Sequence, residues 1–215
     1  GTWSLVGLDL VKPVTDKAAM DFNITNEMGV DDRIRFIKNV AGMWLLEESL
    51  DYWASKGEHY TAAELAKAAA DLPRASVIDA NDPIFEKPGA MPERIAMLCE
   101  KSNQAIPQSP AAYARCIFDS LADAYVKVLA QLQSAAGVKI NAINIVGGGS
   151  ANRLLNQLTA DATGLPVYAG PTEATVLGSV MVQMQSVGLI NSLNQGRVII
   201  KNSITQEEFK PKKIS

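Results

Sequence analysis

The sequence predicts an α/β fold, in which one mixed sheet of five strands carries helices on both faces and is interrupted by a mostly helical insertion. The first part of the chain alternates residues with a period of two, as strands do. The middle repeats apolar residues at steps of three and four, as helices do. The last part returns to short β-branched runs between helical patterns. The five predicted strands are residues 1–10, 22–27, 33–38, 139–146 and 166–169.

The first 40 residues predict three antiparallel strands. Residues 1–10 (GTWSLVGLDL) have apolar residues on both faces of a strand, and residues 33–38 (RIRFIK) alternate in the same way. Residues 28–32 supply the turn before the third strand. Because short turns join antiparallel neighbours, we expect a meander. A buried strand at residue 1 usually has sequence before it, so we expect the chain to be a fragment.

The middle of the chain predicts helices. Thr61, with Glu64 three residues later, has the pattern of a capping box at a helix start. Four prolines break residues 73–92, so residues 57–109 are predicted to form an insertion. Pro110 suits the first turn of a long helix. The predicted helices are residues 42–53, 61–70, 92–102 and 110–135.

The last third predicts a strand, a glycine turn, a helix, a strand and the helix 173–187. Right-handed crossovers would place strand 139–146 beside the first strand, so that loops at the ends of both strands open on one cleft. Gly178 indicates close packing of its helix. Residues 189–215 are expected to be a terminal segment, with a possible strand at 197–201 and a solvated basic end containing Lys210, Lys212 and Lys213.

The glycine turn is the strongest candidate for a ligand site. Gly147, Gly148 and Gly149 allow positive φ and let a ligand approach the backbone. Ser150 or Asn152 can cap the next helix, whose first amide groups then face a polar or anionic group. The alternative is a tight turn that binds nothing. The pattern is neither the phosphate loop GxxxxGK[ST] nor the dinucleotide fingerprint GxGxxG.

Composition excludes several function classes. With 47% hydrophobic and 20% charged residues, the chain has the composition of an ordinary soluble globular protein. A net charge of −3 without a basic stripe gives no reason to propose nucleic acid as a partner. No run approaches the roughly 18 apolar residues of a membrane span, and no signal peptide is evident, so we expect no membrane partner and a cytoplasmic location. Cys99 and Cys116 are too few for a disulfide framework or a zinc site, and His59 lies in a polar, solvated stretch.

Six segments together resemble a known family. They are GTWSLVG, NITNEMG, RIRFIKNVAGMWLLEESL, ARCIFDSLADAY, GGGSANRLLNQLTADATGLPV and AGPTEATVLGSVMVQMQ. In this order they resemble the C-terminal domain of FGGY-family sugar kinases, and within that family its rhamnulokinase branch. The resemblance covers nearly the whole chain and implies the ribonuclease H-like fold of actin and hexokinase.

The resemblance implies a nucleotide site at both ends of the chain. Thr2 would face the phosphates of ATP with its hydroxyl and backbone amide. Gly148, with Gly147 and Gly149, would lie against the nucleoside, and Asn152 near adenine. The alternative for Thr2 is an ordinary strand hydroxyl.

Two further positions follow from the same resemblance. Asn39 matches a position that contacts the sugar in rhamnulokinases, although it could instead cap the helix that follows. Glu47 stands where that branch has a glutamine that contacts nucleotide. A carboxylate there would repel phosphates, so Glu47 departs from the family pattern.

The resemblance implies that the full-length protein transfers the γ-phosphoryl group of ATP to the 1-hydroxyl of L-rhamnulose, with Mg²⁺ on the phosphates. The family's base is an aspartate before the opening Gly-Thr pair. Asp9, Asp16 and Asp21 do not match its motif and are interpreted as loop charges. The missing base and the missing N-terminal sugar-binding domain predict that this chain alone is inactive.

Several alternatives remain open at this point. The chain could be a non-catalytic domain that senses nucleotide or sugar, or a structural module, and xylulose, fuculose or gluconate could replace rhamnulose. Rhamnulokinases can carry a cysteine pair with the spacing of Cys99 and Cys116, which predicts that these thiols lie on neighbouring helices. In a reducing compartment we expect both to be free.

Overall fold

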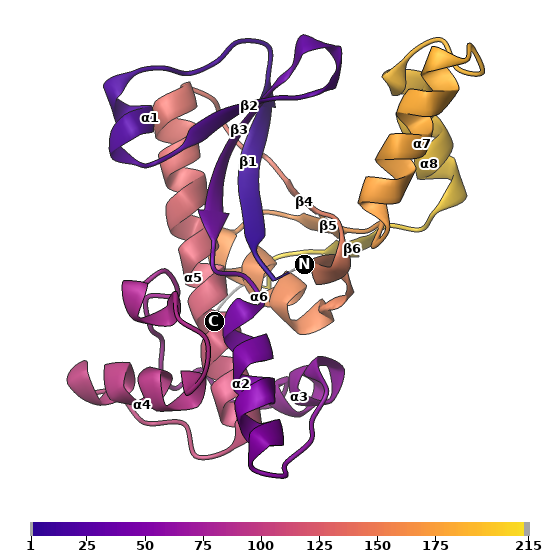
Figure 1. The fold of residues 1–215 in the computed structure, drawn as a ribbon. Helices are drawn as coiled ribbons and strands as arrows, with labels where there is room; N and C mark the ends of the chain where they lie inside the picture. The colour runs from indigo at the N-terminus through magenta and orange to yellow at the C-terminus, as the bar shows by residue number, and fades with distance from the viewer. Residues whose placement is uncertain (1, 213–215) are drawn as a thin grey trace. The chain divides into compact units, whose positions relative to one another are not determined.

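The computed structural model describes residues 2–212 and divides into two compact units (Figure 1). One unit comprises residues 2–140, and the other begins at Asn141. Each unit mixes helices with a small sheet, which confirms the α/β class.

The first unit is built on an antiparallel sheet of three strands. The order is β1 (Ser4–Leu10), β3 (Ile34–Val40) and β2 (Thr25–Met28), with β3 in the middle. The antiparallel pairing was predicted correctly, but the meander order was wrong. The residues between β1 and β2 contain the short helix α1 (Lys17–Asp21), so this connection is long enough to carry the chain past β3. Only the short turn at η1 (Val30–Asp32) makes a hairpin of β2 and β3.

The long helix α5 (Pro110–Ala136) packs against β1 and β3 and supplies much of the core of this unit. Its ends agree with the sequence prediction. The Ser109 side chain accepts a hydrogen bond from the Ala112 N–H, and Pro110 occupies the first turn. Gly137, with φ 63°, ends the helix in the left-handed conformation. Fourteen of its 27 residues are buried, including Ile117, Phe118 and Leu121.

Three shorter helices complete this unit. α2 (Trp44–Ser55) packs against α4 (Met91–Lys101), and α3 (Ala62–Ala69) packs against α5. The capping box predicted at Thr61 and Glu64 is present at the start of α3. A single turn, η2 (Pro83–Phe85), lies in the proline-rich part of the segment predicted to be an insertion.

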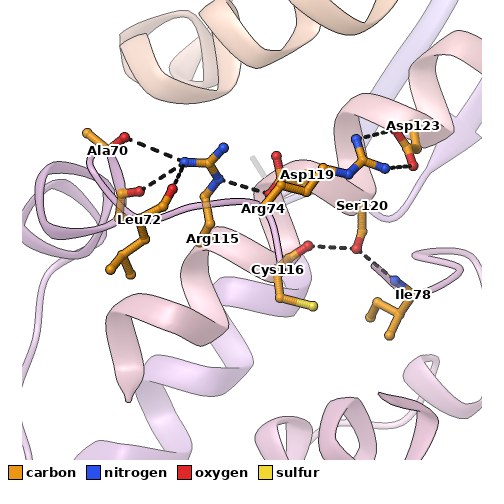
Figure 2. A network of polar contacts seen from close by, with 10 residues as sticks. Ala70, Leu72, Arg74, Ile78, Arg115, Cys116, Asp119, Ser120 and Asp123 are labelled. Atoms are coloured by element: carbon orange, nitrogen blue, oxygen red, sulfur yellow. Dashed lines mark hydrogen bonds and ion pairs between the residues drawn. The ribbon is translucent and has the colours of Figure 1, made fainter. Parts of the chain in front are cut away.

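A buried ion pair within α5 also holds that segment through hydrogen bonds from its arginine (Figure 2). The Arg115 guanidinium donates to the carboxylate of Asp119 at 2.9 Å and to carbonyl groups just after α3, those of Ala70 and Leu72. Burial raises the pKa of Asp119, and the neighbouring Arg115 opposes that rise. The residue after Asp119 makes a second link: the Ser120 hydroxyl accepts a hydrogen bond from the Ile78 N–H at 3.0 Å. The chain between α3 and η2 is therefore held along the face of α5.

The second unit contains a separate sheet of three strands. β4 (Ile143–Ile145) and β5 (Val167–Ala169) are parallel, and β6 (Glu207–Phe209) pairs with the other edge of β5 in the antiparallel direction. The single five-stranded sheet was therefore a wrong prediction: the described strands form two sheets of three. Within residues 139–146 only three residues are paired, and the third partner, β6, comes from a segment predicted to be solvated.

Helix α6 (Arg153–Thr163) packs on this sheet and also binds the end of the chain. The Gln157 side chain donates to the Lys210 carbonyl at 2.9 Å, and the Asp161 carboxylate accepts from the Lys212 N–H at 2.7 Å. Lys210 and Lys212 are exposed, as predicted, but the expectation of a free end was wrong for the backbone of residues 207–212, which a strand and two helix side chains hold. Lys213 lies outside the described residues.

Two helices follow β5, namely α7 (Ala174–Ser186) and α8 (Leu193–Ser203). The predicted strand at 197–201 was wrong because Ser192 caps a helix there, its side chain accepting from the Gln195 N–H. Close packing occurs at Gly196, where an added Cβ would lie 2.8 Å from the sulfur of Met181. At Gly178, where we expected it, a Cβ would meet nothing within 4 Å.

No helix formed by residues 2–212 is both long enough and apolar enough to cross a bilayer.

Candidate functional site

In the first unit, the backbone at Thr2 is pinned against the start of α2. The Thr2 carbonyl accepts a hydrogen bond from the Trp44 N–H at 3.0 Å. Gly42 has φ +54°, and a Cβ there would lie 2.4 Å from the Thr2 carbonyl oxygen and 2.7 Å from the Ser4 nitrogen. Only glycine allows this approach without displacement of the backbone. Thr2 thus precedes β1 in a turn whose position is fixed by α2.

A partly buried pair of hydroxyl groups fixes Ser4, the first residue of β1. The Ser4 hydroxyl and the Tyr125 hydroxyl of α5 are 2.7 Å apart. Burial raises the pKa of Tyr125, while the hydrogen bond to Ser4 opposes that rise. Tyr125 therefore stays protonated at neutral pH, and its hydroxyl connects β1 to α5 through a neutral hydrogen bond.

Asn39 lies on β3 beside a pocket of about 430 Å³ in the same unit. It is exposed and pairs in register with Leu5 of β1. The alternative, that Asn39 caps the next helix, was wrong, since α2 begins after Met43 without a side-chain cap. The pocket combines aromatic rings with amide and charged groups, and its lining includes Trp3, Lys38, Trp44, Asp79, Asn81, Asp82 and Gln131.

The loop that closes this pocket is attached to the end of β3. The Asn81 side-chain oxygen accepts a hydrogen bond from the Ala41 N–H at 3.1 Å. On the other side, the Lys38 ammonium donates to the Phe22 carbonyl at 2.6 Å and to the Gln131 side-chain oxygen at 2.9 Å. Partial burial lowers the pKa of Lys38. The pocket therefore offers fixed hydrogen-bonding groups next to aromatic surface, a combination that suits a polyhydroxylated ligand.

Glu47 lies in the first turn of α2 and is exposed to solvent. A carboxylate at this position interacts favourably with the positive end of the helix dipole. The helix dipole alone therefore explains a glutamate at this position, without any nucleotide. The contact of Glu47 with nucleotide stays a prediction.

In the second unit, the glycine turn directly follows β4. Gly147 has φ 78°, and residues 148–151 form one turn of 3₁₀ helix, η3. Both the N–H and the hydroxyl of Ser150 donate to the Gly147 carbonyl, at 3.0 and 2.7 Å. A Cβ added at any of the three glycines would meet nothing within 4 Å. The backbone of this turn is closed by hydrogen bonds on one side and open to an approaching ligand on the other.

Asn152, and not Ser150, is the residue that caps α6. Its side-chain oxygen accepts a hydrogen bond from the Leu155 N–H at 3.0 Å. The prediction left both residues open. Four residues on, Asn156 is fully buried, and its side-chain nitrogen donates to the Ser150 carbonyl at 2.9 Å. Sequence reasoning missed Asn156, although a polar residue on the buried side of an amphipathic helix was a usable signal.

The predicted site residues thus fall into two sets, one in each unit. Thr2, Asn39 and Glu47 belong to the first unit, and Gly147–Gly149 with Asn152 belong to the second. Within the first unit, Thr2 is tied to α2, and Asn39 lines the pocket together with Trp44 from the first turn of the same helix.

Comparison with known proteins decides the family. Residues 1–187 match the FGGY family of carbohydrate kinases, C-terminal domain. The chain belongs to this family.

Its similar curated relatives are rhamnulokinases. The chain is 41% identical to the rhamnulokinase of Oceanobacillus iheyensis over 203 residues, which are 94% of this chain and 43% of the relative. It is 43% identical to that of Mannheimia succiniciproducens over 210 residues, which are 98% of this chain and 43% of the relative. The FGGY domain described here therefore spans less than half the length of these relatives.

Solved structures of sugar kinases share its fold. The xylulose kinase from Rhodospirillum rubrum aligns with 99% of this chain and 42% of its own, with a TM-score of 0.66 and 16% identity. The Plasmodium falciparum glycerol kinase with ADP aligns with 99% of this chain and 42% of its own, with a TM-score of 0.67 and 12% identity. At such identities the likeness establishes the fold of the FGGY domain and nothing finer.

The three aspartates near the start of the FGGY domain have local roles. Asp9 lies within β1 and forms an ion pair with Arg33 at 3.0 Å, so its interpretation as a loop charge was wrong. The Asp16 side chain accepts from the Ala19 N–H and caps α1, and Asp21 pairs with Lys17. Within residues 2–212, no three side chains of the types His, Cys, Asp and Glu converge as metal ligands would.

Cys99 of α4 and Cys116 of α5 are both buried and both free, and they are close enough for Cys99 to affect the pKa of Cys116, which confirms that they lie on neighbouring helices. Burial raises the pKa of Cys116 to about 12, and the neighbouring Cys99 adds to the rise. A thiol with so high a pKa is protonated at neutral pH and is a poor nucleophile. The pair therefore contributes packing to this domain. His59 is exposed, as predicted.

Proposed function

We propose that this chain is the C-terminal nucleotide-binding domain of an ATP-dependent sugar kinase, and that the full-length protein transfers the γ-phosphoryl group of ATP to the 1-hydroxyl of L-rhamnulose. The observation that carries the proposal is the 41–43% identity to rhamnulokinases over nearly the whole chain. Both units belong to this one domain in our proposal, with residues 57–109 as an insertion and 189–215 as a terminal segment, and its location is cytoplasmic.

The glycine turn is proposed to hold the nucleoside. Its support is the open space above Gly147, Gly148 and Gly149, which lets a planar base or a ribose rest on the backbone. Asn152 then lies near adenine, where its side-chain amide could bind the base while it caps α6. Thr2 would present its hydroxyl and N–H to the phosphates from a turn that α2 holds in place.

The pocket beside Asn39 is proposed to take part of the sugar. Aromatic faces such as those of Trp3 and Trp44 suit the C–H surface of a carbohydrate, and the amides of Asn39 and Asn81 can bind its hydroxyl groups. Glu47 stays the least supported member of the site, because it is exposed on the first turn of α2.

ATP and Mg²⁺ complete the proposed reaction. In our proposal the ion is held chiefly by the phosphates and by water. Bound there, Mg²⁺ would neutralise charge on the transferring phosphoryl group. The residues of this domain bind and orient the two substrates, and the base that takes the sugar's proton is expected from the N-terminal domain of the same polypeptide.

A coupled assay tests this proposal. With ATP, Mg²⁺ and L-rhamnulose, the 215-residue chain should show no turnover, whereas the full-length gene product that contains it should phosphorylate the sugar. Turnover by the chain alone would contradict the proposal that the base comes from the N-terminal domain.

Parallel assays of the full-length protein with xylulose, fuculose and gluconate test the substrate. A kcat/KM higher for any of these than for L-rhamnulose would reassign the sugar. Binding of ATP without phosphorylation of any of the four would instead favour a nucleotide-sensing domain.

A further inference from the structure

Asn156 is a buried polar residue with one satisfied and one unsatisfied group. It sits in the first turns of α6 and is 0% exposed. Its side-chain nitrogen donates to the Ser150 carbonyl at 2.9 Å. Its side-chain oxygen has no hydrogen-bond partner within residues 2–212, and it is the only such buried side-chain atom there.

A buried acceptor without a donor destabilises a fold, because the group loses its hydrogen bonds to water and gains none. An apolar side chain with the same branching would pack at this position without that loss. Stability of α6 therefore gives no reason for an asparagine here. The reason has to come from the one hydrogen bond that Asn156 makes.

That hydrogen bond leads directly to the glycine turn. Asn156 holds the carbonyl of Ser150, and the N–H and hydroxyl of Ser150 hold the carbonyl of Gly147. Three hydrogen bonds thus connect the interior of α6 to the first glycine after β4. Since the glycines themselves contact nothing through a Cβ, side-chain packing does not fix the shape of this turn.

We propose that Asn156 is a positioning residue of the nucleotide site, which sets the glycine turn through Ser150 without touching the ligand. The inference rests on the proposed function, because it assumes that the turn receives the nucleoside. Asn156 keeps the backbone of Gly147–Ala151 in one conformation before the ligand arrives, so that binding does not have to order it.

The variant Asn156→Leu tests the proposal, because leucine keeps the branch at Cγ and removes both polar atoms. The matched control is Thr159→Val on the same helix, since Thr159 is also buried but its hydroxyl donates to the carbonyl of Leu155 within α6 itself. Thermal melting, hydrogen exchange of the amides of residues 147–152, and calorimetry with the non-hydrolysable analogue AMP-PNP and Mg²⁺ are measured on the same chain.

We expect Asn156→Leu to keep or raise the melting temperature, since it removes the unsatisfied oxygen. Exchange at residues 147–152 should become about tenfold faster. The Kd for AMP-PNP should rise by about tenfold, because the turn is no longer preorganised. Thr159→Val should leave both the exchange and the Kd as they are. Unchanged exchange in Asn156→Leu, or equal changes in the two variants, would overturn the inference.

If Asn156→Leu fails to fold, Ser150→Ala serves as the second variant. It removes the hydrogen bond from the Ser150 hydroxyl to the Gly147 carbonyl, which belongs to the same chain of three hydrogen bonds. It should also speed exchange at the turn, and no change there would equally contradict the proposal.

The two proposals fail in different ways. If the parent chain binds no AMP-PNP but Asn156→Leu still loosens the turn, the nucleotide function is wrong and only the structural part of the inference stands, namely that Asn156 holds the glycine turn. If the parent chain binds AMP-PNP and Asn156→Leu binds it equally well with unchanged exchange, the positioning role is wrong and the nucleotide function stands.

Discussion

Glycine serves opposite purposes in the two units of the chain. At Gly42 the backbone is pressed against the start of β1, so that an added Cβ would lie 2.4 Å from the Thr2 carbonyl oxygen. At Gly147, Gly148 and Gly149 an added Cβ would meet nothing within 4 Å. The first glycine is needed for the protein's own packing, and the triplet leaves room for something else.

This difference separates two causes of the same residue choice. A glycine demanded by packing affects the free energy of unfolding, whereas a glycine that leaves space affects ligand binding. Mutations of Gly42 should therefore change the free energy of unfolding, and mutations of the glycine triplet should change the affinity for the ligand. The following predictions run from the largest expected change in unfolding free energy to the smallest.

Gly42→Ala should destabilise the chain most. Alanine would suffer both from φ +54° and from the contact with Thr2, and we expect a loss of about 3 kcal/mol. Gly57→Ala is the control, because Gly57 also has positive φ but open space around it, so its cost should be about 1 kcal/mol. Urea unfolding of the two variants gives the comparison. Equal losses would show that Gly42 is chosen for its φ alone.

The buried thiol of Cys116 offers a second measure of packing in the first unit. In the folded chain burial raises its pKa to about 12, against 9.0 for an accessible thiol. Between these values the unfolded state loses the proton first, so stability falls as pH rises, by about 1.4 kcal/mol per pH unit from this group. Cys116→Ser should show a correspondingly flatter loss of stability between pH 9 and 11 in urea unfolding. Parallel pH profiles of the two proteins would contradict the assignment.

Asn152→Ala should have an intermediate effect. Loss of the cap on α6 is expected to cost about 1 kcal/mol, and binding of AMP-PNP should weaken as well. Asn152→Ser separates the two effects, since serine restores the cap but not an amide near adenine. Recovery of both stability and affinity in Asn152→Ser would show that Asn152 acts only as a cap.

Gly148→Ala should change stability least. Its φ is not positive and the space around it is open, so we expect less than about 0.5 kcal/mol in urea unfolding. The bulkier Gly148→Leu should fold equally well but bind AMP-PNP at least about tenfold more weakly, because its side chain fills the space over the turn. Unchanged affinity in Gly148→Leu would remove the turn from the proposed site.

Local signals in the sequence predicted local structure well. Pro110 and the apolar residues at steps of three and four that follow it predicted α5, and the capping box at Thr61 predicted α3, because these patterns act within a few residues. Residues 197–201 were predicted as a strand because valine and isoleucine favour strands. The Ser192 cap and the packing of Gly196 on Met181 make them helical instead.

Long-range features could not be read in the same way. The pairing of β1 with one edge of β3 depends on contacts between residues far apart in the chain. The same is true of the pairing of β6 with β5. In the candidate site, the glycine turn and the cap at Asn152 were predictable because they are local. Three features of the site arise only when distant residues pack together: the pocket, the role of Gly42 and the hydrogen bond from Asn156 to Ser150. In the sequence alone, Gly42 looks like any glycine before a helix, because its contact with Thr2 exists only in the folded chain.

The strand β6 lies beyond residue 187, where the match to the family ends, yet it covers one edge of β5. Phe209 of β6 is buried against Val167 and Ala169 of β5 and Ala160 of α6. A chain cut at the family boundary would leave the hydrogen-bonding groups of β5 unpaired beside this exposed apolar surface. An uncovered edge of this kind is a template for pairing with another molecule, and β6 occupies that edge of β5 within the same chain.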